Sequence, residues 1–219
     1  MRLHVGLAVA LALAGCGSDY EALRDWSWQA RDSVLPITQP RLPPGPPVTL
    51  APPAPVTQEG RAGAVLALQE GIAAWLGYLA LLADDIRPPA QGSTVEALAP
   101  RVEAFDPEGA AALLDLGRLM DHGVDQGWRA ATLPNAVDLG DRYVQTALAA
   151  LRRQFELLAR ERAEDRRRAA ARDAILDRVG AGHAMLKERS AILGQGETAR
   201  LLRAQDRELR RLLLLAAAG

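Results

Sequence analysis

The sequence predicts an all-α fold: an antiparallel helical bundle preceded by a disordered proline-rich tether. Three observations indicate it: Ala, Leu and Arg are abundant among the 219 residues, only 4% of the side chains are aromatic, and apolar residues recur three and four positions apart. Ala, Leu and Arg favour helix, whereas strands are enriched in β-branched and aromatic residues. The formal net charge of −1 provides no overall field towards nucleic acid, so we expect no nucleic-acid partner.

Residues 1–15 have the layout of an export signal peptide. Arg2 supplies a positive charge, and the apolar run of residues 5–14 is too short to span a bilayer, which takes about 20 helical residues. The run ends in Leu13-Ala14-Gly15-Cys16, and Cys16 is the only cysteine in the chain. A single cysteine excludes an internal disulfide and a thiolate metal cluster.

Residues 1–18 resemble the lipobox segment of bacterial lipoproteins. The resemblance implies that the signal is removed before Cys16, that the Cys16 sulfur carries a diacylglycerol, and that the membrane is a partner through this lipid anchor. Gly17 and Ser18 stand where an aspartate usually retains such proteins in the inner membrane, so the resemblance implies the outer membrane, on its periplasmic side. The alternative is a soluble secreted protein with a free thiol.

Residues 16–33 form the expected membrane-proximal segment, with a short helix that places Tyr20, Leu23 and Trp26 on one side. An indole so close to lipid suits the membrane interface, but it could equally pack in a protein core. Both interpretations stay open at this stage.

Residues 34–58 contain nine of the fourteen prolines, which interrupt helix and sheet alike. We expect a tether that holds the domain on the order of 60 Å from the anchor when fully extended. The PxxP spacing of residues 40–43 leaves open a role as a ligand for an aromatic groove.

Residues 59–219 are the expected helical bundle domain. Its first helix follows Thr57 and ends at Asp84-Asp85, and an acid, Glu70, in its middle disfavours a membrane span. Ser93 and Glu96 have the spacing of a capping box, and Asp106-Pro107 begins a further helix. The first helix has a heptad seam made of Val65, Leu68, Ile72, Trp75, Leu79, Leu82 and Ile86.

The longest predicted helix begins at Asn135 and includes the nine arginines from Arg152 to Arg178, because nothing breaks it before Gly180. Its 44 residues would make a rod of about 65 Å. We expect this long charged helix to form a coiled-coil-like hairpin with the C-terminal helix, residues 197–218. Acids are interleaved with the arginines, so the charges read as a solvated helix face. Residues 150–215 are the predicted surface for a protein partner or for self-association, and the apolar tail of residues 212–218 should dock into the bundle.

No catalytic, cofactor or metal site is assigned from the sequence. His122 and His183 could join Asp121 or Asp125 in a three-ligand zinc site, but no HExxH is present and we expect capping or surface histidines. Asp84 and Asp85 could form an acid pair. The leading hypothesis is a non-enzymatic, lipid-anchored envelope protein with a structural or protein-interaction role. The alternatives are a metal-dependent hydrolase and a binder of a small apolar ligand, enclosed by Trp75, Tyr78, Trp128 and Tyr143.

Overall fold

The computed structural model describes residues 20–35, 58–161 and 165–218, and all regular elements in these ranges are helical. The predicted all-α bundle is confirmed. The α-helices are α2 (Glu21–Val34), α3 (Gln58–Ala83), α4 (Gly92–Glu96), α5 (Ala99–Glu103), α6 (Pro107–Asp125), α7 (Leu133–Glu161), α8 (Asp165–Glu188) and α9 (Gly196–Ala218), and the 3-10 turns are η1 (Ala130–Thr132) and η2 (Ser190–Ile192).

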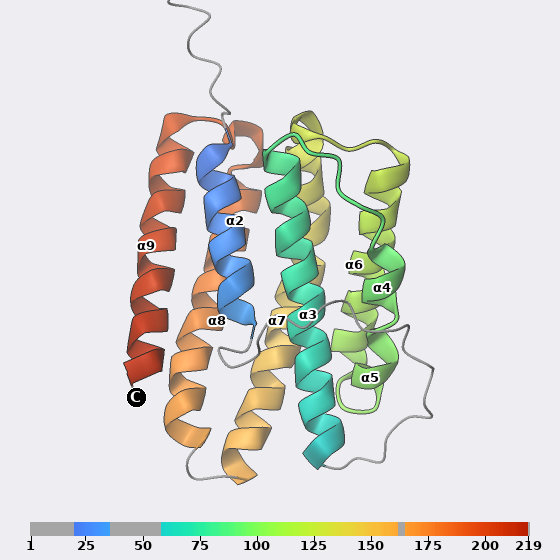
Figure 1. Cartoon of the computed structure of the whole chain (residues 1–219), viewed down its shortest axis with the longest axis vertical. Helices are drawn as coiled ribbons and strands as arrows, with labels where there is room; N and C mark the ends of the chain where they lie inside the picture. Colours follow the sequence, from blue (N-terminus) through green and yellow to red (C-terminus); the bar gives the residue numbers. More distant parts are fainter. Residues whose placement is uncertain (1–19, 36–57, 162–164, 219) are drawn as a thin grey trace, which may run out of the picture.

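The helices form two layers with a flanking helix on either side (Figure 1). Helices α2 and α3 lie antiparallel in one layer, and α7 and α8 lie antiparallel behind them. Helix α9 packs against α2 and α8, whereas α6, with the short α4 and α5, covers the other side against α7 and α3. The core therefore lies between the layers, with α3 at its centre.

Helix α3 is apolar on nearly every face because other helices surround it. By length and composition it could cross a membrane, but 78% of its most apolar window is buried inside the bundle. From Val65 to Leu82 the predicted seam is buried. Ile86 was expected to continue the seam but lies beyond the end of α3 and is 48% exposed.

Helix α2 belongs to the bundle. Leu23 is 1% exposed and Trp26 is fully buried, so the structure places Trp26 in the core and not at a lipid interface. Trp28 is half-buried beneath the guanidinium of Arg31, whose central carbon lies 5.0 Å from the ring centroid. The bundle thus includes residues 21–34, which the sequence assigned to a membrane-proximal segment.

This position of α2 changes what the proline-rich segment connects. Residues 36–57, which make up most of the expected tether, lie outside the described residues. The residues that flank the segment are described: Val34 ends α2, Gln58 begins α3, and these helices pack against each other. The segment therefore joins two helices of the bundle, and the expectation that it precedes the bundle as a tether is wrong.

The predicted 44-residue helix is two helices. Helix α7 ends at Glu161 and α8 begins at Asp165, so the rod of about 65 Å does not form. The physical reason is apolar burial: Ile175, Leu176 and Val179 of α8 are at most 3% exposed because the chain reverses and packs α8 against α7. The second half of the predicted helix does pair with the C-terminal helix, since α8 packs against α9.

The glycines expected to break this region lie inside α8. A Cβ atom added to Gly182 would overlap the indole ring of Trp26, so a glycine here lets α2 approach α8 closely. A helix that is packed on both sides tolerates glycine despite its low helix propensity. Tertiary contact therefore overrides the predicted break.

The two predicted helix starts have different outcomes. Asp106 caps α6, because its carboxylate accepts a hydrogen bond from the backbone N–H of Gly109 at 2.9 Å, as expected. The capping box at Ser93 is wrong, since Ser93 is the second residue of α4 and Gln91 precedes the helix. Asp121 of α6 accepts from the backbone N–H of Gly92 instead, at 2.9 Å. A side chain from another helix thus provides the hydrogen-bond acceptor for a free N–H at the start of α4.

Candidate functional site

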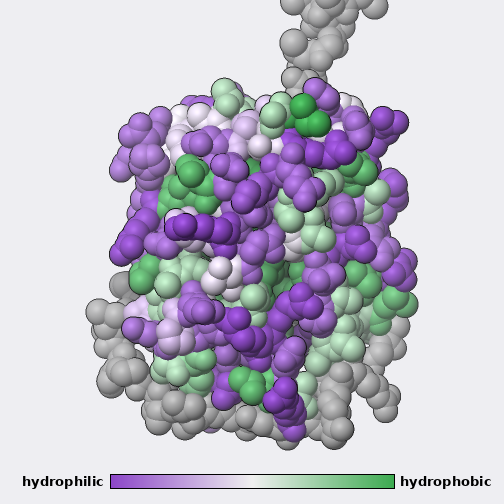
Figure 2. Space-filling model, turned by 180° about the vertical axis from the view of Figure 1, so that it is seen from behind, coloured by the Kyte–Doolittle hydropathy of each residue, from purple (hydrophilic) through white to green (hydrophobic). Residues whose placement is uncertain are grey.

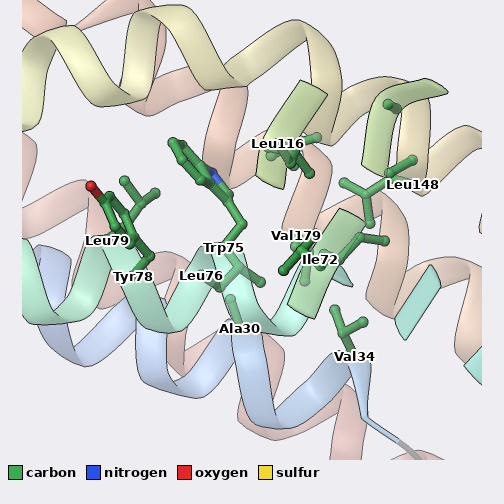
Figure 3. Packing of buried hydrophobic residues seen from close by; sticks show 14 of the residues in the cluster. Ala30, Val34, Ile72, Trp75, Leu76, Tyr78, Leu79, Leu116, Leu148 and Val179 are labelled. Atoms are coloured by element: carbon green, nitrogen blue, oxygen red, sulfur yellow. The ribbon is translucent and has the colours of Figure 1, made fainter. Parts of the chain in front are cut away.

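A chain of polar side chains crosses the core between the two layers. The indole N–H of Trp75 on α3 donates to Nε2 of His183 on α8 at 3.1 Å. Nδ1 of the same ring lies 2.9 Å from a carboxylate oxygen of Asp141 on α7. Trp75 points from α3 away from Ala30 of α2 and towards the other layer (Figure 3). The three helices are thus joined through one imidazole.

The hydrogen bonds fix the state of His183. Because Nε2 accepts from Trp75, it carries no proton, and Nδ1 must donate to Asp141. The ring is therefore a neutral imidazole with both nitrogens occupied. It is also fully buried, so neither nitrogen can reach a substrate or a metal ion.

Asp141 carries the negative charge in this series of hydrogen-bonded side chains. Burial raises its pKa, but hydrogen bonds from His183 and Gln145 and the electrostatic interactions with His183 and Lys187 outweigh the burial and lower the pKa to about 2. Nζ of Lys187 lies 3.4 Å from the second carboxylate oxygen of Asp141, where the series of polar side chains reaches the surface. Asp141 therefore stays ionised at neutral pH and orients the imidazole.

The expectation of capping or surface histidines holds for His122 and is wrong for His183. His122 is exposed in the last turn of α6, and its ring meets Trp128 edge to face at 5.9 Å between centroids. Within the described ranges, His, Cys, Asp and Glu side chains form no group of three or more that could hold a metal ion. Asp121, part of the expected zinc set, bonds to the Gly92 backbone.

The aromatic residues proposed to enclose a ligand are packed against protein. Trp75 and Tyr78 are fully buried and stacked, with ring centroids 5.7 Å apart and planes 11° apart. A Cβ atom added to Gly140 would overlap the ring of Trp75, and one added to Gly123 would overlap the hydroxyl of Tyr78. Glycine backbone fills the space beside both rings, which argues against a ligand there.

The hydroxyl of Tyr78 is an unusual polar group for a core of this kind. It is buried and has no hydrogen-bond partner among the described residues. Burial, with a smaller contribution from the charge of Asp121, raises the pKa of Tyr78 to about 12. The hydroxyl is therefore protonated over the whole physiological range.

The two acids at the end of α3 have structural roles. Asp84 lies 3.1 Å from a guanidinium nitrogen of Arg24 on α2. Asp85 has a left-handed backbone with φ of 54°, and its carboxylate accepts from the backbone N–H of Ala130 at 3.1 Å. Bonds from the Ile86 N–H to the Leu81 carbonyl and from Asp85 to Leu82 complete a Schellman cap. Both carboxylates are thus engaged, and they do not act together as an acid pair.

Charged side chains of the arginine-rich region pair between helices. Arg152 of α7 binds Asp173 of α8 through two hydrogen bonds of 2.6 and 3.1 Å and contacts Asp177 at 3.3 Å. The guanidinium of Arg172 lies over the ring of Phe155, 4.9 Å from its centroid. These contacts hold the α7–α8 hairpin closed.

A surface groove of about 520 Å³ runs between α7 and α8. Buried Leu148 and Leu176 line it together with Gly180, and the exposed side chains of Arg152 and Asp177 stand at its edge. The face of the bundle behind α2 and α3 is mainly hydrophilic, with separate hydrophobic patches (Figure 2). Part of the predicted partner surface, residues 150–215, therefore combines small apolar and charged groups.

The C-terminal helix is only partly covered. Leu212 and Leu213 pack against the core, whereas Leu214 is 73% exposed and Leu215 is 57% exposed. The predicted docking of the tail therefore holds for one side of α9 only. Two adjacent leucines remain available to solvent near the end of the chain.

Cys16, the predicted lipidation site, lies outside the described residues. Comparison with protein-family models, with curated proteins and with solved structures finds no match for this chain.

Proposed function

We propose that the protein is a lipid-anchored component of the bacterial cell envelope with a structural or protein-interaction role and no catalytic activity of its own. Its anchor is acylated Cys16, and its place is the periplasmic side of the outer membrane. The lipobox resemblance of residues 1–18 supports the anchor, and the enclosed polar core supports the non-catalytic role.

The main support for the non-catalytic role is that the imidazole of the Asp141–His183 pair is enclosed in the core. A carboxylate that orients an imidazole is the arrangement that general-base catalysis uses, and it is the best candidate among the described residues. In this protein Nε2, the nitrogen that would take a proton from a nucleophile, accepts from Trp75 instead. The ring is fully buried, so the pair serves the stability of the bundle.

The partner surface that we propose is the hairpin region of residues 150–215. Among the described residues of this region, Leu214 and Leu215 on α9 have the most exposed large apolar side chains. The occupant is a protein, either a different chain or a second copy. Light scattering on the chain lacking residues 1–16 distinguishes a second copy, which doubles the mass, from a different partner.

The anchor is tested by Cys16→Ala, with Ser18→Ala as the matched control. The Cys16→Ala variant should appear in soluble fractions or remain in the membrane as the uncut precursor, whereas Ser18→Ala should be cut and anchored like the wild type. Mass spectrometry of the native protein should show acyl chains on Cys16. A Cys16→Ala variant that is still cut and anchored would refute the proposal.

A further inference from the structure

The packing of α2 leaves very little chain between the proposed anchor and the bundle. Four residues separate Cys16 from Glu21, the first residue of α2. At no more than about 3.6 Å per residue, the start of α2 lies within about 18 Å of the acylated residue. This limit on the distance follows from the proposed anchor at Cys16. It fixes which part of the bundle lies next to the lipid.

Several helix ends meet around the start of α2. Arg24 in the first turn of α2 contacts Asp84 at the end of α3, 3.1 Å away. A guanidinium nitrogen of Arg129, just before η1, donates to the backbone carbonyl of Asp85. These residues, with Ile86 and Arg87, form one end of the bundle, the upper end in Figure 1, which we call the anchor end.

The opposite end is beyond the reach of the anchor. Helix α3 runs from Gln58 to Ala83, and its 26 residues are about 39 Å long. Ala62, in the first turns of α3, is exposed and lies near the far end. An upright bundle therefore keeps Ala62 in water while the anchor end touches lipid.

The side chains of the anchor end suit a lipid surface. Ile86 is 48% exposed, so the anchor end presents a large aliphatic side chain to its surroundings. The guanidinium of Arg24 pairs with Asp84 and also contacts Glu21 and Asp25. Arg189 pairs with Glu197, and Asp85 accepts from the backbone N–H of Ala130. An exposed apolar side chain whose charged neighbours are held in ion pairs and hydrogen bonds can enter the headgroup region.

We propose that the bundle stands on the membrane by its anchor end, held there by the short connection to Cys16, with Ile86 in contact with the lipid interface. The partner is the bilayer surface itself. The hairpin of α7 and α8 then extends away from the membrane, since Glu161 and Asp165 lie at the far end.

Two single-cysteine variants of the acylated full chain test this orientation. In Ile86→Cys and Ala62→Cys the new residue is the only free thiol, because acylation blocks Cys16. Each thiol is labelled with an environment-sensitive fluorophore, and the protein is reconstituted into phosphatidylethanolamine and phosphatidylglycerol vesicles that contain brominated acyl chains. We expect a loss of fluorescence at position 86 and none at position 62. Equal quenching at both positions, or none at either, would overturn the inference.

A third variant tests whether the short connection sets the orientation. A flexible Gly/Ser insertion of twelve residues between Ser18 and Asp19 leaves the anchor and the bundle intact, and it should restore most of the fluorescence at position 86. Unchanged quenching would overturn the role of the connection. Mass spectrometry on the same samples keeps the two proposals apart, because a protein without acyl chains refutes the anchor, whereas an acylated protein with the wrong quenching pattern refutes only the orientation.

Discussion

The indole N–H of Trp75 and the imidazole of His183 are hydrogen-bonded across the bundle, although 108 residues separate them in the sequence. The contact ties the centre of α3 to α8, and Asp141 extends it to α7. A buried polar chain of this kind stabilises a fold only when each member keeps its partner. The consequences for stability can be tested residue by residue.

His183→Ala should lower the free energy of unfolding by about 2–4 kcal/mol, because it opens a cavity and leaves the Trp75 N–H without its acceptor. Urea denaturation followed by circular dichroism measures the change. His122→Ala is the matched control, since that side chain is exposed, and it should change stability by no more than about 0.5 kcal/mol. Equal losses in the two variants would contradict the buried role of His183.

Asp141 should make the protein sensitive to acid. Its folded pKa of about 2 lies below the value of about 3.9 in an unfolded chain, so its ionisation stabilises the fold above about pH 4. This contribution, on the order of 2 kcal/mol, is lost as the pH falls through about 2. Urea denaturation between pH 7 and pH 2 should show the wild type losing its advantage over Asp141→Asn in acid. A difference that stays constant with pH would exclude this origin.

Gly182→Ala should destabilise the protein by about 1–3 kcal/mol, because the added methyl group overlaps the indole of Trp26. The same change at Gly63, a helical glycine of α3 with open space around it, should stabilise by about 0.4–1 kcal/mol through helix propensity and chain entropy. Thermal unfolding of the two variants compares them directly. A gain at both positions would mean that α2 does not approach α8 closely at Gly182.

Tyr78→Phe should leave stability unchanged or raise it by about 1 kcal/mol, because it removes a buried hydroxyl that lacks a partner among the described residues. Tyr143→Phe is the comparison: that hydroxyl accepts from Arg142 at 2.8 Å, and its loss should cost about 0.5–1 kcal/mol. Both free energies come from urea denaturation. A clear loss in Tyr78→Phe would show that the hydroxyl has a partner after all.

Asp106→Ala should cost about 2–3 kcal/mol, because it removes both the cap of α6 and the bidentate pair with Arg153, whose two bonds are 2.9 Å long. Burial raises the pKa of Asp106, but the hydrogen bonds from Arg153 and the Gly109 N–H outweigh it and lower the pKa. Asp106→Asn keeps the capping oxygen and should lose about half as much stability. Asn and Ala variants of equal stability would contradict the capping role.

The sequence predicts the helices well where residues close together in the chain specify them. The spacing of Val65, Leu68 and Ile72 identifies the central helix, and the residue types at Asp106 and Pro107 identify the start of α6. These features are local, because helix periodicity and capping depend on neighbours within about four residues.

The polar core could not be predicted in this way. Asp141 lies in the predicted rod of residues 135–178, whereas His183 lies beyond its predicted break, 42 residues from Asp141. Only the reversal of the chain between α7 and α8 brings them together, and no glycine or proline in the sequence marks it. A useful clue was the apolar face of Ile175, Leu176 and Val179, which a free-standing rod would have exposed to water.

The place of α2 in the bundle also has a consequence for proteolysis. In the proposed form anchored at Cys16, a single cleavage between residues 36 and 57 would break the covalent path from the anchor to most of the protein, yet α2 would still be packed against α3 and α9. The two fragments of the cleaved molecule should remain associated. Attachment of the larger fragment to the membrane would then depend on the noncovalent burial of side chains such as Leu23 and Trp26. Mild denaturant would release the larger fragment and leave the short acylated one behind.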